Sequence, residues 1–285
     1  MHRLKDKFSS GGGLLHYGMG KWYPGEILPL WALGCYWRED GTPIWRDRNL
    51  MAVDGKDYGY TVPQAETVIR ELTKQLGINN SSVIPTYELE TEELAGFALP
   101  ILPVLWEGEL RWSSCDWKLP DEKLILLKGD SPLGFRLPLN AIAWAEELHP
   151  EARVPLTHKP AVVGSEPINL PDNSVRVAMA VEVRGGCIHV FLPPITSARC
   201  FLDLITAIEN TAKTVDIPVL IEGYTPPGND GIVGFQITPD PGVIEVNIHP
   251  AKNWEELVKI TASLYEEARL CRLGTEKYAI DGRRI

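Results

Sequence analysis

Hydrophobic and polar positions are most regular between residues 173 and 285. Val and Met positions alternate with Arg, Ala and Glu positions over residues 175–183, a glycine pair occupies 185–186, and a second apolar run covers 187–192. Because successive side chains of a strand point to opposite faces, this pattern predicts a β-hairpin. Apolar residues recur at helical spacing over residues 197–215, which predicts a helix.

Three more strands and a second helix complete this region. The strands are predicted at residues 218–224, 232–238 and 242–249. Asn253, with Glu256 three residues later, is typical of a helix start. The order β-β-α-β-β-β-α with tight turns indicates an α+β fold, in which a mixed, mainly antiparallel sheet carries helices on one face.

The preceding part of the chain is less regular and rich in Trp, Pro and Gly. All tryptophans except Trp254 lie before residue 150. A helix is predicted over Thr61–Leu76, and strands over Trp31–Trp37 and Lys123–Leu127. Repeated prolines between residues 150 and 173 place a domain boundary there. We therefore expect a Trp-rich α+β region over 1–172 and a second domain over 173–285.

Alternation within the strands of the second domain defines a polar face. Three different strands each place one glutamate on it, at Glu182, Glu222 and Glu245. The same face carries further polar side chains at His189, Gln236, Asn247 and His249, but no lysine. Glutamate is depleted in strands, so its recurrence needs an explanation. The residues leave two interpretations open: the solvated side of a sheet, or a carboxylate cluster that binds a hard cation such as Mg²⁺.

Composition removes several classes of function. The 285 residues include 28 Lys and Arg against 38 Asp and Glu, and the formal net charge of −10 argues against a general nucleic-acid binder. No apolar run is long enough to span a membrane, and the start of the chain does not resemble a secretory signal. The five cysteines contain no CxxC pair, which is typical of a reducing compartment, so we expect a cytoplasmic protein.

Several long motifs resemble a family of bacterial amidoligases. The segments that carry the resemblance are Lys21–Glu26, Gly129–Gly134, Ile221–Tyr224, Thr238–Pro250 and Leu273–Tyr278. They extend over essentially the whole chain. That family is grouped with the glutamine synthetase-like carboxylate–amine ligases and is often fused to a transglutaminase-like domain.

The resemblance implies a chemistry for the polar face. In glutamine synthetase-like enzymes, glutamates on adjacent antiparallel strands hold Mg²⁺ or Mn²⁺, and Glu222 and Glu245 resemble such a pair, with Glu182 similar to a third. The cations would bridge the phosphates of ATP, and an amine would displace phosphate from an activated substrate carboxylate. Gln236, Asn247, His249 and Lys277 are the implied nucleotide- or substrate-binding residues. Small-molecule or peptide carboxylates and amines are the implied substrates, and such folds often share sites between subunits of a homo-oligomer.

The family pattern continues beyond Asp281–Arg283 with a glycine-rich stretch that this chain does not contain. We therefore expect residues 173–285 to be the first half of a glutamine synthetase-like catalytic domain, and the chain to be a fragment.

Other interpretations come from different classes of protein. Cys115 and Asp116 with His149 or His158 supply the residue types of a cysteine nucleophile, although no signature surrounds them. A zinc site from Cys187, His189 and His249 is a further alternative, but the three glutamates favour a hard ion. Surface tryptophans would instead suit a non-catalytic module that binds a substrate or peptide.

Overall fold

The structure is a computed structural model that describes residues 1–9, 12–20, 31–119, 123–164, 166–228, 231–240, 243–274, 276, 278–279 and 281–284. The chain forms two compact units. The terminal unit contains Met1–Ile44 and Gly231–Ile285, and the central unit contains Trp45–Asp230. The predicted boundary after residue 172 falls inside the central unit, and the division into two sequence domains stays a prediction.

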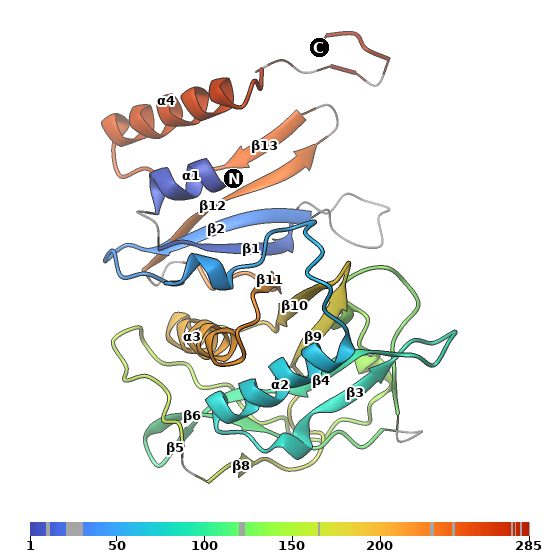
Figure 1. Ribbon diagram of the computed structural model, residues 1–285. Coiled ribbons are helices and arrows are strands. Elements are labelled where there is room, and N and C mark those ends of the chain that lie inside the picture. Colours follow the sequence, from blue (N-terminus) through green and yellow to red (C-terminus); the bar gives the residue numbers. More distant parts are fainter. Residues whose placement is uncertain are drawn as a thin grey trace. The chain divides into compact units, whose positions relative to one another are not determined.

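The central unit is built on a mixed sheet. Its strands are, in spatial order, β11 (Val219–Gly223), β10 (Cys187–Leu192), β9 (Ala178–Arg184), β4 (Leu94–Pro100), β3 (Ile84–Tyr87) and β7 (Leu124–Ile125). The pairs β10–β11 and β3–β7 are parallel, whereas β9–β10, β4–β9 and β3–β4 are antiparallel. The helix α3 (Ala198–Val215) connects β10 to β11 and packs against α2 (Val62–Leu76), which lies along β4 and β9 (Figure 1).

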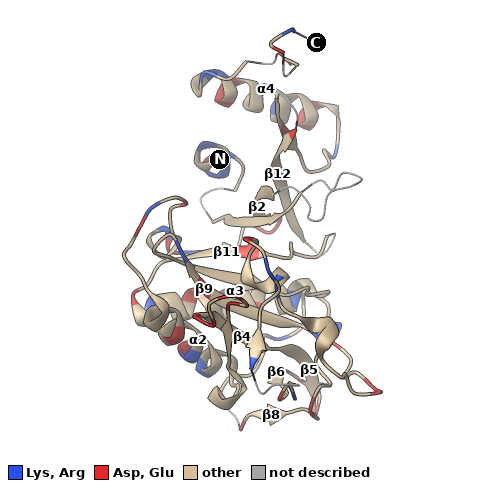
Figure 2. Cartoon of the chain, turned by 90° about the vertical axis from the view of Figure 1, so that its right-hand side faces the viewer, with Lys and Arg blue, Asp and Glu red and all other residues tan. Residues whose placement is uncertain are grey.

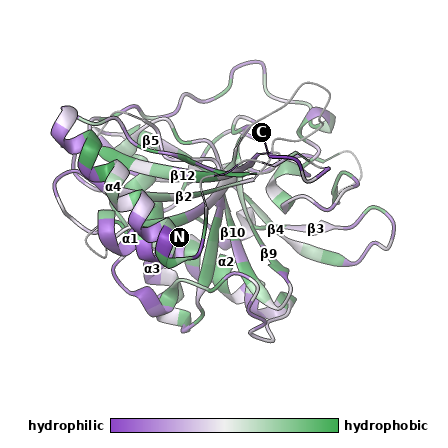
Figure 3. Ribbon diagram, turned by 90° about the horizontal axis from the view of Figure 1, so that it is seen from above, coloured by the Kyte–Doolittle hydropathy of each residue, from purple (hydrophilic) through white to green (hydrophobic). Residues whose placement is uncertain are grey.

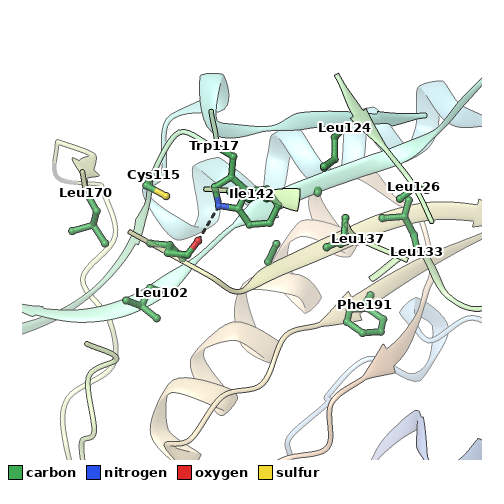
Figure 4. Packing of buried hydrophobic residues seen from close by; sticks show 14 of the residues in the cluster. Leu102, Cys115, Trp117, Leu124, Leu126, Leu133, Leu137, Ile142, Leu170 and Phe191 are labelled. Atoms are coloured by element: carbon green, nitrogen blue, oxygen red, sulfur yellow. Dashed lines mark hydrogen bonds between the residues drawn. The ribbon is translucent and has the colours of Figure 1, made fainter. Parts of the chain in front are cut away.

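The central unit also contains loops and a second, small sheet. This small sheet contains β5 (Leu102–Trp106), β6 (Glu109–Ser114) and β8 (Ile168–Asn169). Short 3₁₀ helices complete the unit at η1 (Arg48–Leu50), η2 (Asn80–Ser82), η3 (Leu133–Phe135) and η4 (Leu139–Ala141). Trp117, Leu133 and Phe191 belong to one buried cluster, in which Trp117 Nε1 donates to the carbonyl of Val175 at 2.8 Å (Figure 4).

The same cluster includes Ala178 and Ala180, which share a face of β9 with Glu182. The face that carries Glu182 is therefore covered by protein. Side chains on both faces of β9 and β10 are buried, and most residues of these two strands are hydrophobic (Figure 3). This burial explains why the alternating pattern there does not mark a solvated side.

The terminal unit has an antiparallel sheet and two helices. In spatial order its strands are β13 (Val243–Asn247), β12 (Ile232–Asp240), β2 (Trp31–Arg38) and β1 (Leu14–Met19). Helices α1 (His2–Phe8) and α4 (Trp254–Leu270) contact each other (Figure 1). The ring of Phe8 lies 5.7 Å from that of Phe235, so α1 packs on the face of β12 that carries Phe235.

Local sequence signals explain where the helices begin and end. Thr61 and Gln64 form the capping box of α2, and Gly77 ends it with a φ of +68°. Ser197 caps α3, and Asn253 caps α4 through the amide of Glu256. Charged residues of both signs mark the exposed side of α2 (Figure 2). The three predicted helices and the α+β class are confirmed.

Two predicted strands are shorter than expected. The segment Lys123–Leu127 forms a strand only over Leu124–Ile125. The first strand of the hairpin begins at Ala178 instead of Val175, because Val175 is buried in the Trp117 cluster and its carbonyl accepts from that indole. The hairpin turn is correct, with positive φ at Gly185 and Gly186.

The tryptophans of the first part of the chain differ in burial. Trp45 is 1% exposed, whereas Trp31 is 54% exposed. Trp37 is half-buried and packs against Phe235, and Trp22 lies outside the described residues.

Candidate functional site

Two of the three predicted metal-binding glutamates lie together in the central unit. In the hairpin, Glu182 is paired with His189, and in the neighbouring parallel pair, Glu222 is paired with Phe191. Residues paired across adjacent strands share a face, and alternation places His189 and Phe191 on the same one. The period-2 pattern therefore predicted correctly that Glu182, His189 and Glu222 face the same way.

Arg184 connects these side chains, and it was not among the predicted site residues. Its Nη1 donates to Oε1 of Glu182 at 3.1 Å, and its Nη2 donates to Oε2 of Glu222. Arg184 follows Glu182 by two residues on the last position of β9. Residues two positions apart in a strand lie on the same face, so the spacing of Arg184 from Glu182 is the sequence signal that could have identified it. We call Glu182, Arg184, His189 and Glu222 the carboxylate cluster.

Nδ1 of His189 has two polar neighbours in the cluster. It lies 2.6 Å from Nη2 of Arg184 and 3.1 Å from Oε2 of Glu222. A guanidinium can only donate and a carboxylate can only accept, so the tautomer of His189 sets which of these two contacts is a hydrogen bond. Nη2 of Arg184 itself donates to Oε2 of Glu222.

Burial makes the charges of this cluster strongly interdependent. Glu182, His189 and Glu222 are 7%, 9% and 2% exposed. Burial raises the pKa of Glu182, and the positive charge of Arg184 opposes that rise. Oε1 of Glu222 is buried and has no hydrogen-bond partner among the described residues. An unsatisfied buried carboxylate oxygen is costly, so it needs a donor or a cation.

The loop that follows β7 and includes η3 contacts the carboxylate cluster. The amide of Leu133 donates to Oε1 of Glu182 at 2.8 Å. Gly134 fits against the ring of Phe191, where an added Cβ would lie 2.1 Å from a ring carbon. Arg136 pairs through its guanidinium with Glu88 and the carbonyl of Leu127. The motif Gly129–Gly134 thus positions Glu182 and Phe191.

Aromatic rings border the cluster on one side. The rings of Phe135 and Phe191 lie 4.8 Å apart, edge to face, and Tyr224 lies 6.1 Å from both. Tyr224 is half-buried. Phe191 is itself paired with Glu222 in the sheet, so these rings pack beside a strand neighbour of that carboxylate.

The terminal unit carries the other predicted polar residues on one face of its sheet. Gln236 is paired with Asn247, and Thr238 is paired with Glu245. Nε2 of Gln236 donates to the hydroxyl of Tyr36 at 2.7 Å. Burial raises the pKa of Tyr36 to about 12, so its hydroxyl stays protonated at neutral pH. Glu245 thus belongs to a polar sheet face of the terminal unit.

His249 does not share the face of Asn247. The strand ends at Asn247, and the imidazole lies 5.1 Å from the ring of Trp37 and 6.2 Å from that of Phe8. Burial lowers the pKa of His249, which favours the neutral ring. Its position on the helix-covered side differs from the predicted one because period-2 alternation does not continue past the end of a strand. Lys277 lies outside the described residues.

The two alternatives based on cysteine are less consistent with the geometry. Cys115 is 2% exposed and burial raises its pKa, whereas a nucleophilic cysteine needs a lowered pKa. His149 and His158 are half-buried, and each ring contacts a backbone carbonyl. Burial raises the pKa of Cys187 to about 11, which opposes its use as a zinc thiolate.

In the part of the chain that the structure describes, no three His, Cys, Asp or Glu side chains are grouped as a ready-made metal site. Helices that could cross a membrane are also missing from the described residues. The chemistry available at the carboxylate cluster is that of two buried carboxylates, one guanidinium and one imidazole.

Comparison with known proteins identifies one family. A family model described as a putative amidoligase enzyme matches residues 1–95, 88–167 and 156–285, which together cover the chain. No curated protein and no solved structure matches it.

Proposed function

This chain belongs to the putative amidoligase enzyme family, and from this premise we propose that it acts in an ATP-dependent carboxylate–amine ligase. In such a reaction the substrate carboxylate takes the γ-phosphoryl group of ATP to form an acyl phosphate. The amine then attacks the acyl carbon, loses a proton and releases phosphate, which leaves an amide.

One observation supports a specific site for the proposed reaction. Glu182 and Glu222 are buried together, and Oε1 of Glu222 has no hydrogen-bond partner among the described residues. Hard cations such as Mg²⁺ take oxygen ligands, so the donor set fits Mg²⁺ or Mn²⁺. Glu182 and Glu222 would hold the cation, and Glu245, which belongs to the terminal unit, stays a separate prediction as a metal ligand. When bound, the cation neutralises the charge of the phosphates and orients them.

The remaining residues of the site have supporting roles. The Leu133 amide fixes one oxygen of Glu182 at 2.8 Å, which sets the orientation of that carboxylate. Phe135, Phe191 and Tyr224 border the site and limit access of water. Gln236 and Asn247, which are paired in the terminal unit, and Lys277 stay separate proposals for nucleotide or substrate binding.

Calorimetric titration with Mn²⁺ and with Mg-ATP tests the assignment. We expect Glu182→Gln and Glu222→Gln to weaken Mn²⁺ binding at least tenfold, because each removes an anionic oxygen ligand. Glu90→Gln is the matched control, since Glu90 is 67% exposed and pairs with Lys128. Unchanged Mn²⁺ affinity in both the Glu182 and the Glu222 variants would contradict the assignment of a cation to this site. The ligase reaction itself predicts ADP release only when a carboxylate and an amine are both supplied.

A cavity in the terminal unit favours a second candidate, a binding module without catalysis. Its volume is about 960 Å³, and Leu4, Leu33, Ile237, Val246 and Leu264 are among its lining residues. Trp31 and Tyr265 are exposed beside it. An apolar hollow of this size suits a peptide or small molecule. This module would bind neither Mn²⁺ nor Mg-ATP, so the same titrations separate the two functions.

A further inference from the structure

The carboxylate cluster already holds one positive charge at its centre. Arg184 donates to both Glu182 and Glu222, and its Nη2 also lies 2.6 Å from Nδ1 of His189. Two carboxylates and one guanidinium have a formal net charge of −1. Such a charge is expensive to bury. The cluster is therefore compensated only in part, and one buried oxygen of Glu222 has no donor among the described residues.

We propose that Arg184 is the resident counter-ion of Glu182 and Glu222, and that a divalent cation binds to this pair only by displacing the Arg184 guanidinium. The inference rests on the proposed function, because it concerns the cation of that same site. It adds a positioning residue that orients both carboxylates before the cation arrives and competes with it for them.

The donor atoms support this exchange. One oxygen of Glu182, one oxygen of Glu222 and Nδ1 of His189 all lie next to nitrogen atoms of Arg184. Carboxylate oxygens and imidazole nitrogens are ligands that Mn²⁺ also takes, and while Arg184 lies between them these described side chains are not grouped as a metal site. A divalent cation in place of the guanidinium would change the net charge from −1 to zero.

The side chain of Arg184 can also leave the carboxylate cluster. Its side chain is 31% exposed, whereas those of Glu182 and Glu222 are 9% and 3% exposed. It is the last residue of β9 and precedes the Gly185–Gly186 turn. A long, flexible side chain at the end of a strand can turn into solvent without any movement of the strand. The two carboxylates are held more firmly, Glu182 by the Leu133 amide and Glu222 by burial.

The test compares Arg184→Gln with the unchanged chain, by Mn²⁺ calorimetry and by thermal unfolding without metal. We expect Arg184→Gln to unfold at a lower temperature without metal, because the two carboxylates then repel each other. We expect the same variant to bind Mn²⁺ at least tenfold more tightly, because the competing guanidinium is gone. Arg184→Lys, which cannot bridge both carboxylates, should lie between them. Arg70→Gln is the control, since Arg70 is exposed and pairs with Glu66 on α2.

The outcomes distinguish the displacement of Arg184 from the proposed cation site itself. Equal or weaker Mn²⁺ binding in both Arg184 variants overturns the displacement and leaves the proposed cation site intact. If neither the unchanged chain nor Arg184→Gln binds Mn²⁺, the cation assignment itself fails, and the displacement fails with it. If Arg184→Gln does not fold, the Arg184→Lys titration decides, since that variant keeps the positive charge.

Discussion

The backbone amide of Leu133 donates a hydrogen bond of 2.8 Å to Oε1 of Glu182. This bond joins a loop to a strand residue 49 positions later in the chain. It orients a carboxylate that a guanidinium contacts at the same oxygen atom. The loop is therefore part of the site, and changes in it should affect stability and the carboxylate cluster together.

The first prediction concerns Gly134. Replacement by Ala would place a Cβ 2.1 Å from the ring of Phe191, and the buried ring has little room to move. We expect Gly134→Ala to lower the free energy of unfolding by about 1–3 kcal/mol, as overpacking does. Urea denaturation measures the change. Gly228→Ala is the control, because its Cβ would meet no atom within 4 Å. Equal stability of both variants would contradict the close packing of loop and ring.

A second prediction is pH-dependent. The hydrogen bond from Arg136 lowers the pKa of Glu88 below its ordinary value of 4.5. A lowered carboxyl pKa stabilises the fold above the ordinary value, and this stabilisation is lost as the pH falls through the folded-state pKa. We expect Glu88→Gln to cost about 1 kcal/mol or more at pH 7, because buried Arg136 loses a charged partner. The difference should shrink below about pH 4.5, as urea denaturation at several pH values would measure. Glu93→Gln, an exposed neighbour, should show no such trend, and a constant difference for Glu88→Gln would refute the linkage.

Glu209 provides a third test. Its Oε1 accepts from the amides of Arg46 and Asp47 at 2.6 and 2.7 Å, so one side chain of α3 holds the start of the central unit. Glu209→Ala leaves two amides without an acceptor, and we expect it to cost about 2 kcal/mol or more. Hydrogen exchange at those two amides should become faster. Glu66→Ala on α2 removes a surface carboxylate that pairs with Arg70, and it should change neither quantity by much.

Thiol labelling checks the cysteine environments. Of the five cysteines, only Cys271 is exposed. Burial raises the pKa of Cys35 to about 12 and that of Cys200 to about 11, so both remain thiols at neutral pH. We expect a thiol reagent to modify one cysteine in the folded chain and all five after unfolding. The variant Cys271→Ser should react with almost none while folded. Rapid modification of Cys115 would restore the cysteine-nucleophile hypothesis.

Part of the candidate site was predictable because strand alternation is a local property. The parity of Glu182, Glu222 and His189 followed from their positions in the sequence, and the register of β9, β10 and β11 agrees with it. Alternation failed for His249, which lies beyond the last residue of β13 and packs against Trp37. The ends of strands depend on tertiary contacts, as the bond from Trp117 to Val175 shows.

By itself, then, the sequence determined the α+β class, the three longest helices with their caps, and the face on which the glutamates lie. These features depend on side-chain periodicity and on bonds between residues a few positions apart. Only the tertiary structure decided that the face is buried, that Leu133 holds Glu182, and that Arg184 lies between the two carboxylates. Those contacts join residues distant in the chain or depend on what covers the sheet, and periodicity within one strand contains no information about either.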